Sequence, residues 1–271
     1  MARTCSGVTC VVFDISGTVM DFGSQAPVEA FVGLFAQHGV AVTPADARAP
    51  MGLHKRDHLR AMLSNPYVQD RWLQIHGAPP GDSTIEELYR EFPELQKAAI
   101  DRHLDLLPGV AETCAALRTR GIRIGSTTGF ESGMMDTLRA AAASQGYQPD
   151  CWATPDQCGG GRPAPWMMYE ISRQLNVYPL STFVKVGDTP ADIAEARNAG
   201  GWAVAVTKTG NEIGLSLDEL NHLSEDEQAA RLRDAREKFI ALGAHYTVEG
   251  VSDLLPVVDE ISSRITKGER P

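Results

Sequence analysis

The sequence predicts an α/β protein with a doubly wound parallel-sheet (Rossmann-like) core and an inserted all-helical cap domain. Strand-like and helical segments alternate through the second half of the chain, which is typical of a parallel sheet with helices on both faces. Residues 22–105 carry helical patterns and no convincing strand. We therefore expect a core formed by residues 1–21 and 106–271. We expect the cap, residues 22–105, to close over a site.

Three predicted strands of the core lead into a side chain suited to binding. The apolar segment VVF precedes Asp14, GIRIGST precedes Thr128, and STFVKVG precedes Asp188. A helix then ends at Gly200, and the buried strand GWAVAV follows. In doubly wound sheets the ligand lies at the carboxyl ends of the strands. We therefore expect Asp14, Thr128 and Asp188 to lie close together.

Helical signals fill the cap and recur near the end of the chain. They are an apolar helical face at Val28, Phe31, Val32 and Phe35, a helix start at Thr43-Pro44, and capping boxes at Ser83 to Glu86 and Ser224 to Glu227. The last box opens a charged amphipathic helix that we interpret as scaffold.

Composition excludes some partners. The formal net charge of −10 disfavours a nucleic-acid partner, whose phosphates need a basic surface. No apolar run approaches the ~20 residues that a membrane span needs, and the N-terminal segment lacks a signal-peptide core. The five cysteines form no C-x-x-C pair, which disfavours a disulfide framework or a zinc site. We expect a cytoplasmic protein without nucleic-acid or membrane partners.

Carboxylates at the strand ends suit phosphoryl chemistry. Asp14 could attack phosphorus and form an aspartyl-phosphate. Asp188 and Asp192 are four residues apart where a strand gives way to a helix, so both could approach Asp14. Carboxylate oxygens suit Mg2+, which would screen repulsion between Asp14 and an anionic substrate. The structural alternatives are a turn-capping role for Asp14 and a first-turn helix acid at Asp192.

Hydroxyl, amide and guanidinium groups supply the predicted anion site. Thr128 and the Gly129 amide could bind phosphonyl oxygens at a strand-to-helix turn. Strand alternation turns Thr127 elsewhere. Arg162 follows three glycines, and its guanidinium could contact two oxygens at once. The alternative for Arg162 is a solvent-exposed loop arginine.

Ser16 raises the question of the leaving group. Many phosphatases that use a nucleophilic aspartate have an acid two residues later to protonate an alkoxide. Serine is a poor acid, so the leaving group here takes no proton from this position. A carbon leaving group fits if its charge is delocalised by an iminium formed between an aldehyde and a lysine.

The cap contains a lysine suited to that role. Met51, Lys55, His58 and Met62 recur at helical spacing on one face. A sheltered apolar face would lower the pKa of Lys55 and free its amine, and His58 could move protons. We expect Met51 to contact the substrate. The alternative is that both methionines pack inside the cap while Lys55 reaches solvent.

These motifs resemble those of the haloacid dehalogenase superfamily. Four of them match its core pattern: FDISGT, STTG, GGGRPAP and VGDTPAD. APMGLHKRDH in the cap, Arg162 in place of lysine, and the missing acid at Ser16 resemble, more narrowly, the phosphonatase family, which hydrolyses phosphonoacetaldehyde to acetaldehyde and phosphate. The resemblance extends over nearly the whole chain.

The resemblance also implies roles for particular groups. It gives Lys55 the Schiff base, His58 a supporting role, and the Ser16 backbone carbonyl a place among the Mg2+ ligands. It implies a homodimer formed through the caps, for which the predicted helix 26–39 offers apolar surface. Ile15, Ser16 and Phe130 depart from the family pattern, where we expect Trp, Ala and Tyr.

Other readings of the chain stay open. One is a Mg-dependent phosphatase or phosphotransferase of the same superfamily that acts on a small phosphorylated metabolite. Another is a dehalogenase, in which Asp14 attacks carbon and no metal is needed. A third is a non-catalytic binding module. Simple phosphate esters, a chelator and a search for phosphoryl-Asp14 distinguish them.

Overall fold

The computed structural model describes residues 7–271, and its centre is a six-stranded parallel sheet. The strands have the order β3-β2-β1-β4-β5-β6. Their bounds are β1 Cys10–Phe13, β2 Arg123–Thr127, β3 Cys151–Ala153, β4 Phe183–Gly187, β5 Trp202–Val206 and β6 Tyr246–Val248. Together with the helices on its two faces, the sheet confirms the predicted fold class.

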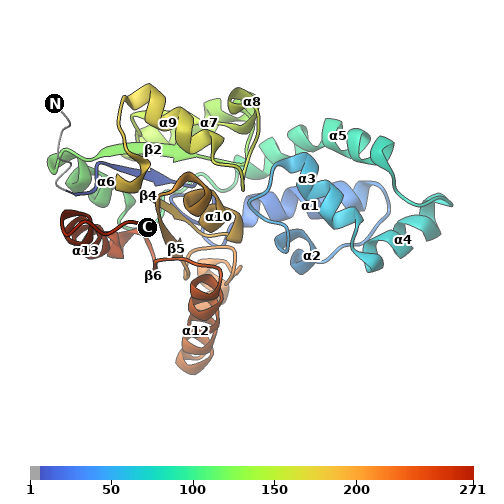
Figure 1. Ribbon diagram of the computed structural model, residues 1–271. Coiled ribbons are helices and arrows are strands. Elements are labelled where there is room, and N and C mark those ends of the chain that lie inside the picture. The colour runs from blue at the N-terminus through green and yellow to red at the C-terminus, as the bar shows by residue number, and fades with distance from the viewer. Residues whose placement is uncertain (1–6) are drawn as a thin grey trace.

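Helices cover both faces of the sheet (Figure 1). One face packs against α6 (Val110–Thr119), α7 (Met135–Ser144) and α13 (Leu254–Thr266). The other packs against α9 (Trp166–Leu175), α10 (Pro190–Ala199) and α12 (Glu225–Ala241). Shorter elements complete the core: α8 Pro155–Cys158, α11 Leu217–Asn221, η1 Ser132–Met134, η2 Leu180–Thr182 and η3 Val251–Asp253. The central strands β1, β4 and β5 are buried along their whole length, as expected for strands covered on both sides.

The strand register brings distant parts of the chain to one edge. Phe13, the last residue of β1, pairs with Ser126 of β2 and Val186 of β4. The residues that follow these three strands therefore leave the sheet side by side. This edge is where the helices of the cap meet the core.

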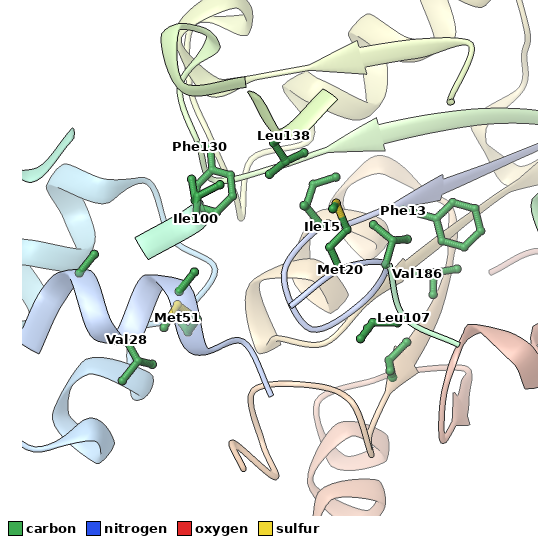
Figure 2. Packing of buried hydrophobic residues seen from close by; sticks show 14 of the residues in the cluster. Phe13, Ile15, Met20, Val28, Met51, Ile100, Leu107, Phe130, Leu138 and Val186 are labelled. Carbon is green, nitrogen blue, oxygen red and sulfur yellow. The ribbon is translucent and has the colours of Figure 1, made fainter. Parts of the chain in front are cut away.

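Five helices lie between β1 and β2 in the chain and gather at one end of the sheet (Figure 1). We refer to them as the cap: α1 Gln25–Gln37, α2 Pro44–Arg48, α3 Lys55–Leu63, α4 Pro66–His76 and α5 Asp82–Ile100. Phe31 of α1 stacks on Phe92 of α5, with ring centroids 4.3 Å apart. Figure 2 shows apolar residues continuing from Met51 in the cap past Phe130 toward Ile15 in the core. The division into two domains stays a prediction.

The structure confirms some of the predicted helix starts and contradicts others. Thr43 and Ser224 cap their helices as predicted, each with a reciprocal bond from an acid three residues later. The predicted box at Ser83 is wrong, because the N-cap of α5 is Gly81, two residues earlier, whose amide donates to the Thr84 hydroxyl at 3.2 Å. The helix expected through Met51 begins only at Lys55.

Two further predictions concern membrane-spanning helices and cysteines. Across residues 7–271, no helix has the length and apolar character that a membrane crossing requires. Cys10, Cys114, Cys151 and Cys158 are free thiols, and Cys5 lies outside the described residues.

Candidate active site

Three buried carboxylates meet at the edge of the sheet. Asp14 follows β1, Asp188 follows β4, and Asp192 lies in the first turn of α10. Each offers an oxygen, and these oxygens lie within 4.8 Å of one another. The structure thus brings together the three carboxylates that the sequence predicts at a metal site.

The electrostatics of the cluster fit a bound cation. Burial raises the pKa of both Asp14 and Asp188, and the charge of Asp14 raises that of Asp188 further. Buried carboxylates that repel one another need positive charge to ionise together. Ser16 borders the same pocket as Asp14 and Asp188. Oxygen donors of this kind suit a hard divalent cation.

Asp192 differs from the other two carboxylates. One of its oxygens accepts bonds from the hydroxyl and amide of Thr189, at 2.6 and 3.2 Å. The other lies 3.0 Å from Arg162 Nη1 and 2.9 Å from Lys185 Nζ. Although burial acts in the opposite direction, these two cations lower the pKa of Asp192. Its direct coordination of a metal stays a prediction.

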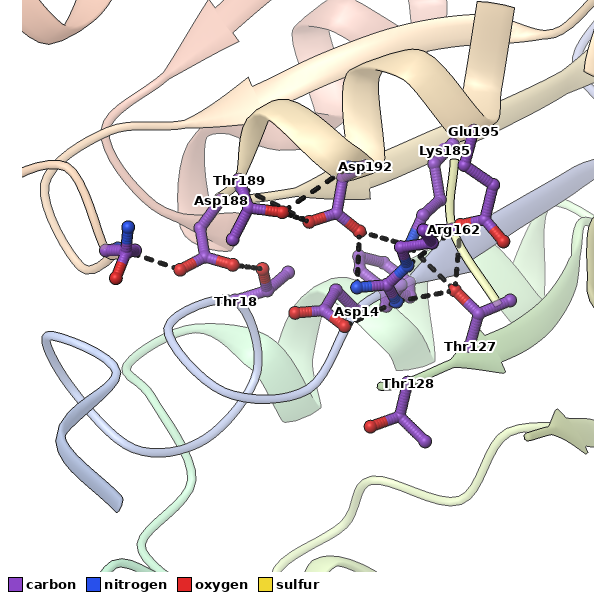
Figure 3. A network of polar contacts seen from close by, with 12 residues as sticks. Asp14, Thr18, Thr127, Thr128, Arg162, Lys185, Asp188, Thr189, Asp192 and Glu195 are labelled. Atoms are coloured by element: carbon purple, nitrogen blue, oxygen red, sulfur yellow. Dashed lines mark hydrogen bonds and ion pairs between the residues drawn. The ribbon is translucent and has the colours of Figure 1, made fainter. Parts of the chain in front are cut away.

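Arg162 is buried among acids and is not the exposed loop arginine of the alternative reading (Figure 3). Its Nη2 lies 2.6 Å from Asp14 Oδ1, its Nη1 3.0 Å from Asp192, and its Nε 3.1 Å from Glu195. A guanidinium fixed on several sides keeps one orientation. Arg162 therefore offers a fixed positive charge beside Asp14.

Three residues of the network around Arg162 were given no role from the sequence. Thr127 accepts bonds from Arg162 Nη2 at 2.9 Å and from Lys185 Nζ at 2.8 Å, and Glu195 accepts from Arg162 Nε (Figure 3). Thr127 does turn away from the pocket, as strand alternation predicts, but toward this network. A lysine within a strand and a glutamate within a helix carry no local signal, since only the fold brings them together.

Thr128 and Gly129 line the same pocket as the carboxylates Asp14 and Asp188. The Thr128 hydroxyl accepts a bond from the Phe130 amide at 3.1 Å, which shapes the turn after β2. A side chain at Gly129 would begin 4.0 Å from Lys55 Nζ and 3.3 Å from the Leu53 carbonyl. The tight contact is the one with Leu53, so glycine here eases the approach of the cap loop before Lys55 to the core.

Lys55 is buried at the start of α3 and lines the same pocket as Asp14. Its Nζ lies 5.4, 5.9 and 5.2 Å from the ring centroids of Phe31, Phe92 and Phe130. No hydrogen bond to the Lys55 side chain occurs within residues 7–271. Burial lowers its pKa to about 8, so a larger share of the amine is unprotonated than for an exposed lysine. The alternative in which Lys55 reaches solvent is wrong.

His58 lies behind Lys55. Its ring stacks on Phe31 with centroids 3.8 Å apart, and Nε2 donates to the Ala47 carbonyl at 2.9 Å. Burial and the nearby Lys55 charge hold the pKa of His58 well below its usual value. Within the described part of the chain, Nδ1 has no partner, so this neutral ring keeps a free acceptor. His58 does not border the pocket itself.

Met51 and Gly52 bring the cap onto the core. Both border the pocket, although Met51 precedes α3 and does not lie on it. Gly52 has φ +91°, and a β-carbon there would meet the Thr189 side chain and Ala191 Cβ. Only glycine allows this close approach between the cap loop and the start of α10.

Comparison with known proteins identifies the class. A family model described as haloacid dehalogenase-like hydrolase matches residues 8–200. The chain belongs to this family of hydrolases, as its motifs predicted, and a divalent metal is generally used there. The acid cluster could bind such a metal.

Within this family, the chain is similar to proteins named phosphonoacetaldehyde hydrolase or phosphonoacetaldehyde hydrolase-like. The chain is 42% identical to phosphonoacetaldehyde hydrolase of Bacillus thuringiensis (strain Al Hakam) over 257 residues, covering 95% of this chain and 97% of that protein. It is 43% identical over 261 residues to a phosphonoacetaldehyde hydrolase-like protein of Syntrophobacter fumaroxidans, covering 96% and 94%. The crystal structure of a phosphonoacetaldehyde hydrolase-like protein from Oleispira antarctica superposes with a TM-score of 0.96 at 38% identity, covering 98% and 97%.

Proposed function

We propose that this protein hydrolyses the carbon–phosphorus bond of phosphonoacetaldehyde to acetaldehyde and phosphate. The observation that carries the proposal is the presence of two nucleophiles of different kinds in one pocket, Lys55 from the cap and Asp14 from the core. An amine suits a carbonyl carbon, and a carboxylate suits phosphorus. The names of the similar proteins, phosphonoacetaldehyde hydrolase and phosphonoacetaldehyde hydrolase-like protein, support the same reaction.

Lys55 prepares the carbon to leave. Its unprotonated amine adds to the aldehyde, and with the uptake of one proton from solvent, water is lost, which gives an iminium on Nζ. The Phe31, Phe92 and Phe130 rings exclude water from Nζ and face the cation that forms there. Nδ1 of His58 is a free acceptor near Lys55 and could take a proton during this addition, through a water molecule because His58 does not border the pocket.

Asp14 takes the phosphorus. As its oxygen bonds to phosphorus, the electron pair of the carbon–phosphorus bond moves into the iminium and gives a neutral enamine. No proton is needed at this step, which agrees with Ser16 in place of an acid. The enamine is then protonated on carbon and hydrolysed to acetaldehyde and free Lys55. Water cleaves the aspartyl-phosphate to phosphate and Asp14.

Fixed charge in the core orients the phosphonate. Arg162 Nη2 is already directed to Asp14, and Thr128 and Gly129 line the same pocket. We infer Mg2+ as the metal, held by Asp14, Asp188 and the Ser16 carbonyl, with Asp192 at the edge of the group. When bound, it offsets the repulsion between Asp14 and the anionic substrate.

We keep the homodimer as a proposal without a defined surface. The apolar residues of α1, including Val28, Phe31 and Phe35, are buried within the protein. They are therefore not available as the exposed apolar surface that the expectation assumed.

The first test measures both products. With Mg2+ and phosphonoacetaldehyde, the native protein should release acetaldehyde and phosphate in equal amounts, and a chelator should abolish both. Lys55→Arg should release neither, because a guanidinium does not form the imine. Retained hydrolysis of simple phosphate esters with no action on the phosphonate would establish the phosphatase alternative. Full activity on a haloacid with excess chelator would favour a dehalogenase.

A further inference from the structure

An arginine of the cap, Arg48 at the end of α2, reaches across to the core. Its Nη1 donates to the Gly23 carbonyl at 2.8 Å and to the Ser24 carbonyl at 3.3 Å, both in the segment that leads into the cap. Its Nη2 donates to the Gly214 carbonyl at 2.8 Å, in the loop after β5. One guanidinium therefore joins the cap, the connecting segment and the core.

Asn211 extends this contact to the carboxylates. Arg48 Nη1 donates to Asn211 Oδ1 at 3.2 Å, and Asn211 Nδ2 donates back to the Arg48 carbonyl at 3.3 Å. The backbone amide of the same asparagine donates to Asp188 Oδ2 at 2.8 Å. The side chain of Asn211 thus binds the cap while its backbone holds a carboxylate of the acid cluster.

We propose that Arg48 and Asn211 form a latch that holds the cap over the pocket and ties its closure to the position of Asp188. The inference rests on the proposed function for its meaning in catalysis, since closure is what brings Lys55 to the substrate. It assigns Arg48 and Asn211 as positioning residues, because neither borders the pocket.

The geometry explains why the latch distinguishes closed from open. Gly23 and Ser24 precede α1 directly, so their bonds to Arg48 can persist when the cap rotates. Asn211 and Gly214 belong to the core, so the bonds to them break when the cap moves away. Gly214 has φ +64°, and a β-carbon there would lie 2.7 Å from Arg48 Nε, so glycine leaves room for the guanidinium.

Asn211 contacts both Arg48 and Asp188, so closure of the cap should be coupled to cation binding by the acid cluster. When Arg48 holds the Asn211 side chain, the amide directed at Asp188 is held too. A cation bound by Asp188 should then favour closure, and closure should strengthen cation binding by the same factor. Coupling of this kind typically changes an affinity by roughly 5- to 150-fold.

The test compares Arg48→Gln and Asn211→Ala with Arg60→Gln. Arg60 lies on α3, is half exposed and pairs with Asp57 of the same helix, so its replacement removes the same charge from a contact within the cap. Small-angle X-ray scattering of the whole protein, with Mg2+ and inorganic phosphate, reports closure without any turnover. We expect the native protein and Arg60→Gln to become more compact, and both latch variants to stay expanded.

Kinetics on phosphonoacetaldehyde supply the second readout. If the substrate must drive closure that the latch no longer favours, KM should rise about tenfold while kcat falls less. Arg48→Lys, which keeps the charge and one donor direction, should give an intermediate KM. Circular dichroism checks that each variant is folded. If Arg48→Gln does not fold, Asn211→Ala alone tests the latch.

Latch variants that are folded and become as compact as the native protein would overturn the proposal. So would equal expansion of Arg60→Gln, which would indicate a general effect of charge. Because scattering does not depend on the substrate, failure of the latch and failure of the proposed reaction give different results.

Discussion

Replacing Lys55 by methionine should raise the melting temperature of the protein and abolish the release of acetaldehyde. The ammonium is buried without a hydrogen bond in the described structure, and its pKa falls from 10.5 to about 8. That shift corresponds to about 3 kcal/mol of unfavourable free energy for the charged form. The three rings around Nζ offset part of it. A gain of about 2 kcal/mol would raise the melting temperature by roughly 4–8 °C.

The pH dependence of this gain has a definite sign. The folded-state pKa of Lys55 lies below that of the unfolded chain, so the charged lysine destabilises the fold at all pH values below about 8. The penalty disappears as the pH rises from about 8 to 10.5, where both states lose the proton. The stability gain of Lys55→Met should therefore be full at neutral pH and shrink toward pH 10.5, as thermal unfolding at several pH values would show.

A second buried lysine provides the matched control. Lys185 lies on β4 and pairs with Asp192 at 2.9 Å and Glu195 at 3.6 Å. Lys185→Met leaves these buried acids with less positive charge, and loss of one partner of a buried pair typically costs about 3–5 kcal/mol. The same substitution should therefore stabilise the protein at position 55 and destabilise it at position 185. Destabilisation at both positions would contradict this account of Lys55.

Asp14→Asn should abolish phosphate release while leaving imine formation intact. Removal of a nucleophile typically lowers the rate by roughly 10^4- to 10^6-fold. Lys55 lies on the cap and needs no bond to Asp14 to reach the aldehyde. Borohydride added with phosphonoacetaldehyde should therefore reduce the imine before the carbon–phosphorus bond breaks. Mass spectrometry should find an adduct on Lys55 that still contains phosphorus.

Lys55→Met should show the opposite result to Asp14→Asn, with phosphoryl transfer to Asp14 kept and imine formation lost. That variant should form no adduct, yet Asp14 should still accept a phosphoryl group from an acyl phosphate, because a carboxylate leaves without a proton. Phosphorus-free adducts in Asp14→Asn would mean that another group attacks the phosphorus, and Asp14 would lose its assigned role.

The sequence predicted the parts of the site that have a local signal. Asp14, Thr128 and Asp188 each end an apolar strand, and the rule that parallel strands bring their carboxyl ends to one edge was enough to place them together. Spacing alone left the solvent-exposed alternative open for Lys55, and the missing acid at Ser16 together with the family resemblance favoured the catalytic role. The missing acid also indicated the kind of leaving group.

Other features could not be predicted because they depend on three-dimensional contact. Lys185 on β4 and Glu195 on α10 look like ordinary members of a strand and a helix. Yet Glu195 accepts a bond from Arg162, and Lys185 donates to Thr127, which also accepts from Arg162. Arg48 and Asn211 are 163 residues apart in the chain. Met51 was assigned to a helix from its spacing, but the loop before Lys55 brings it to the pocket in a turn.

The central claim is that a cap amine activates carbon while a core carboxylate takes phosphorus. Treatment of the native protein with phosphonoacetaldehyde, Mg2+ and borohydride, followed by peptide mapping, tests it most directly. We expect an ethyl group on Lys55 with no phosphorus attached, left when borohydride reduces the imine of acetaldehyde. Continued release of acetaldehyde with Lys55 unmodified would contradict the account.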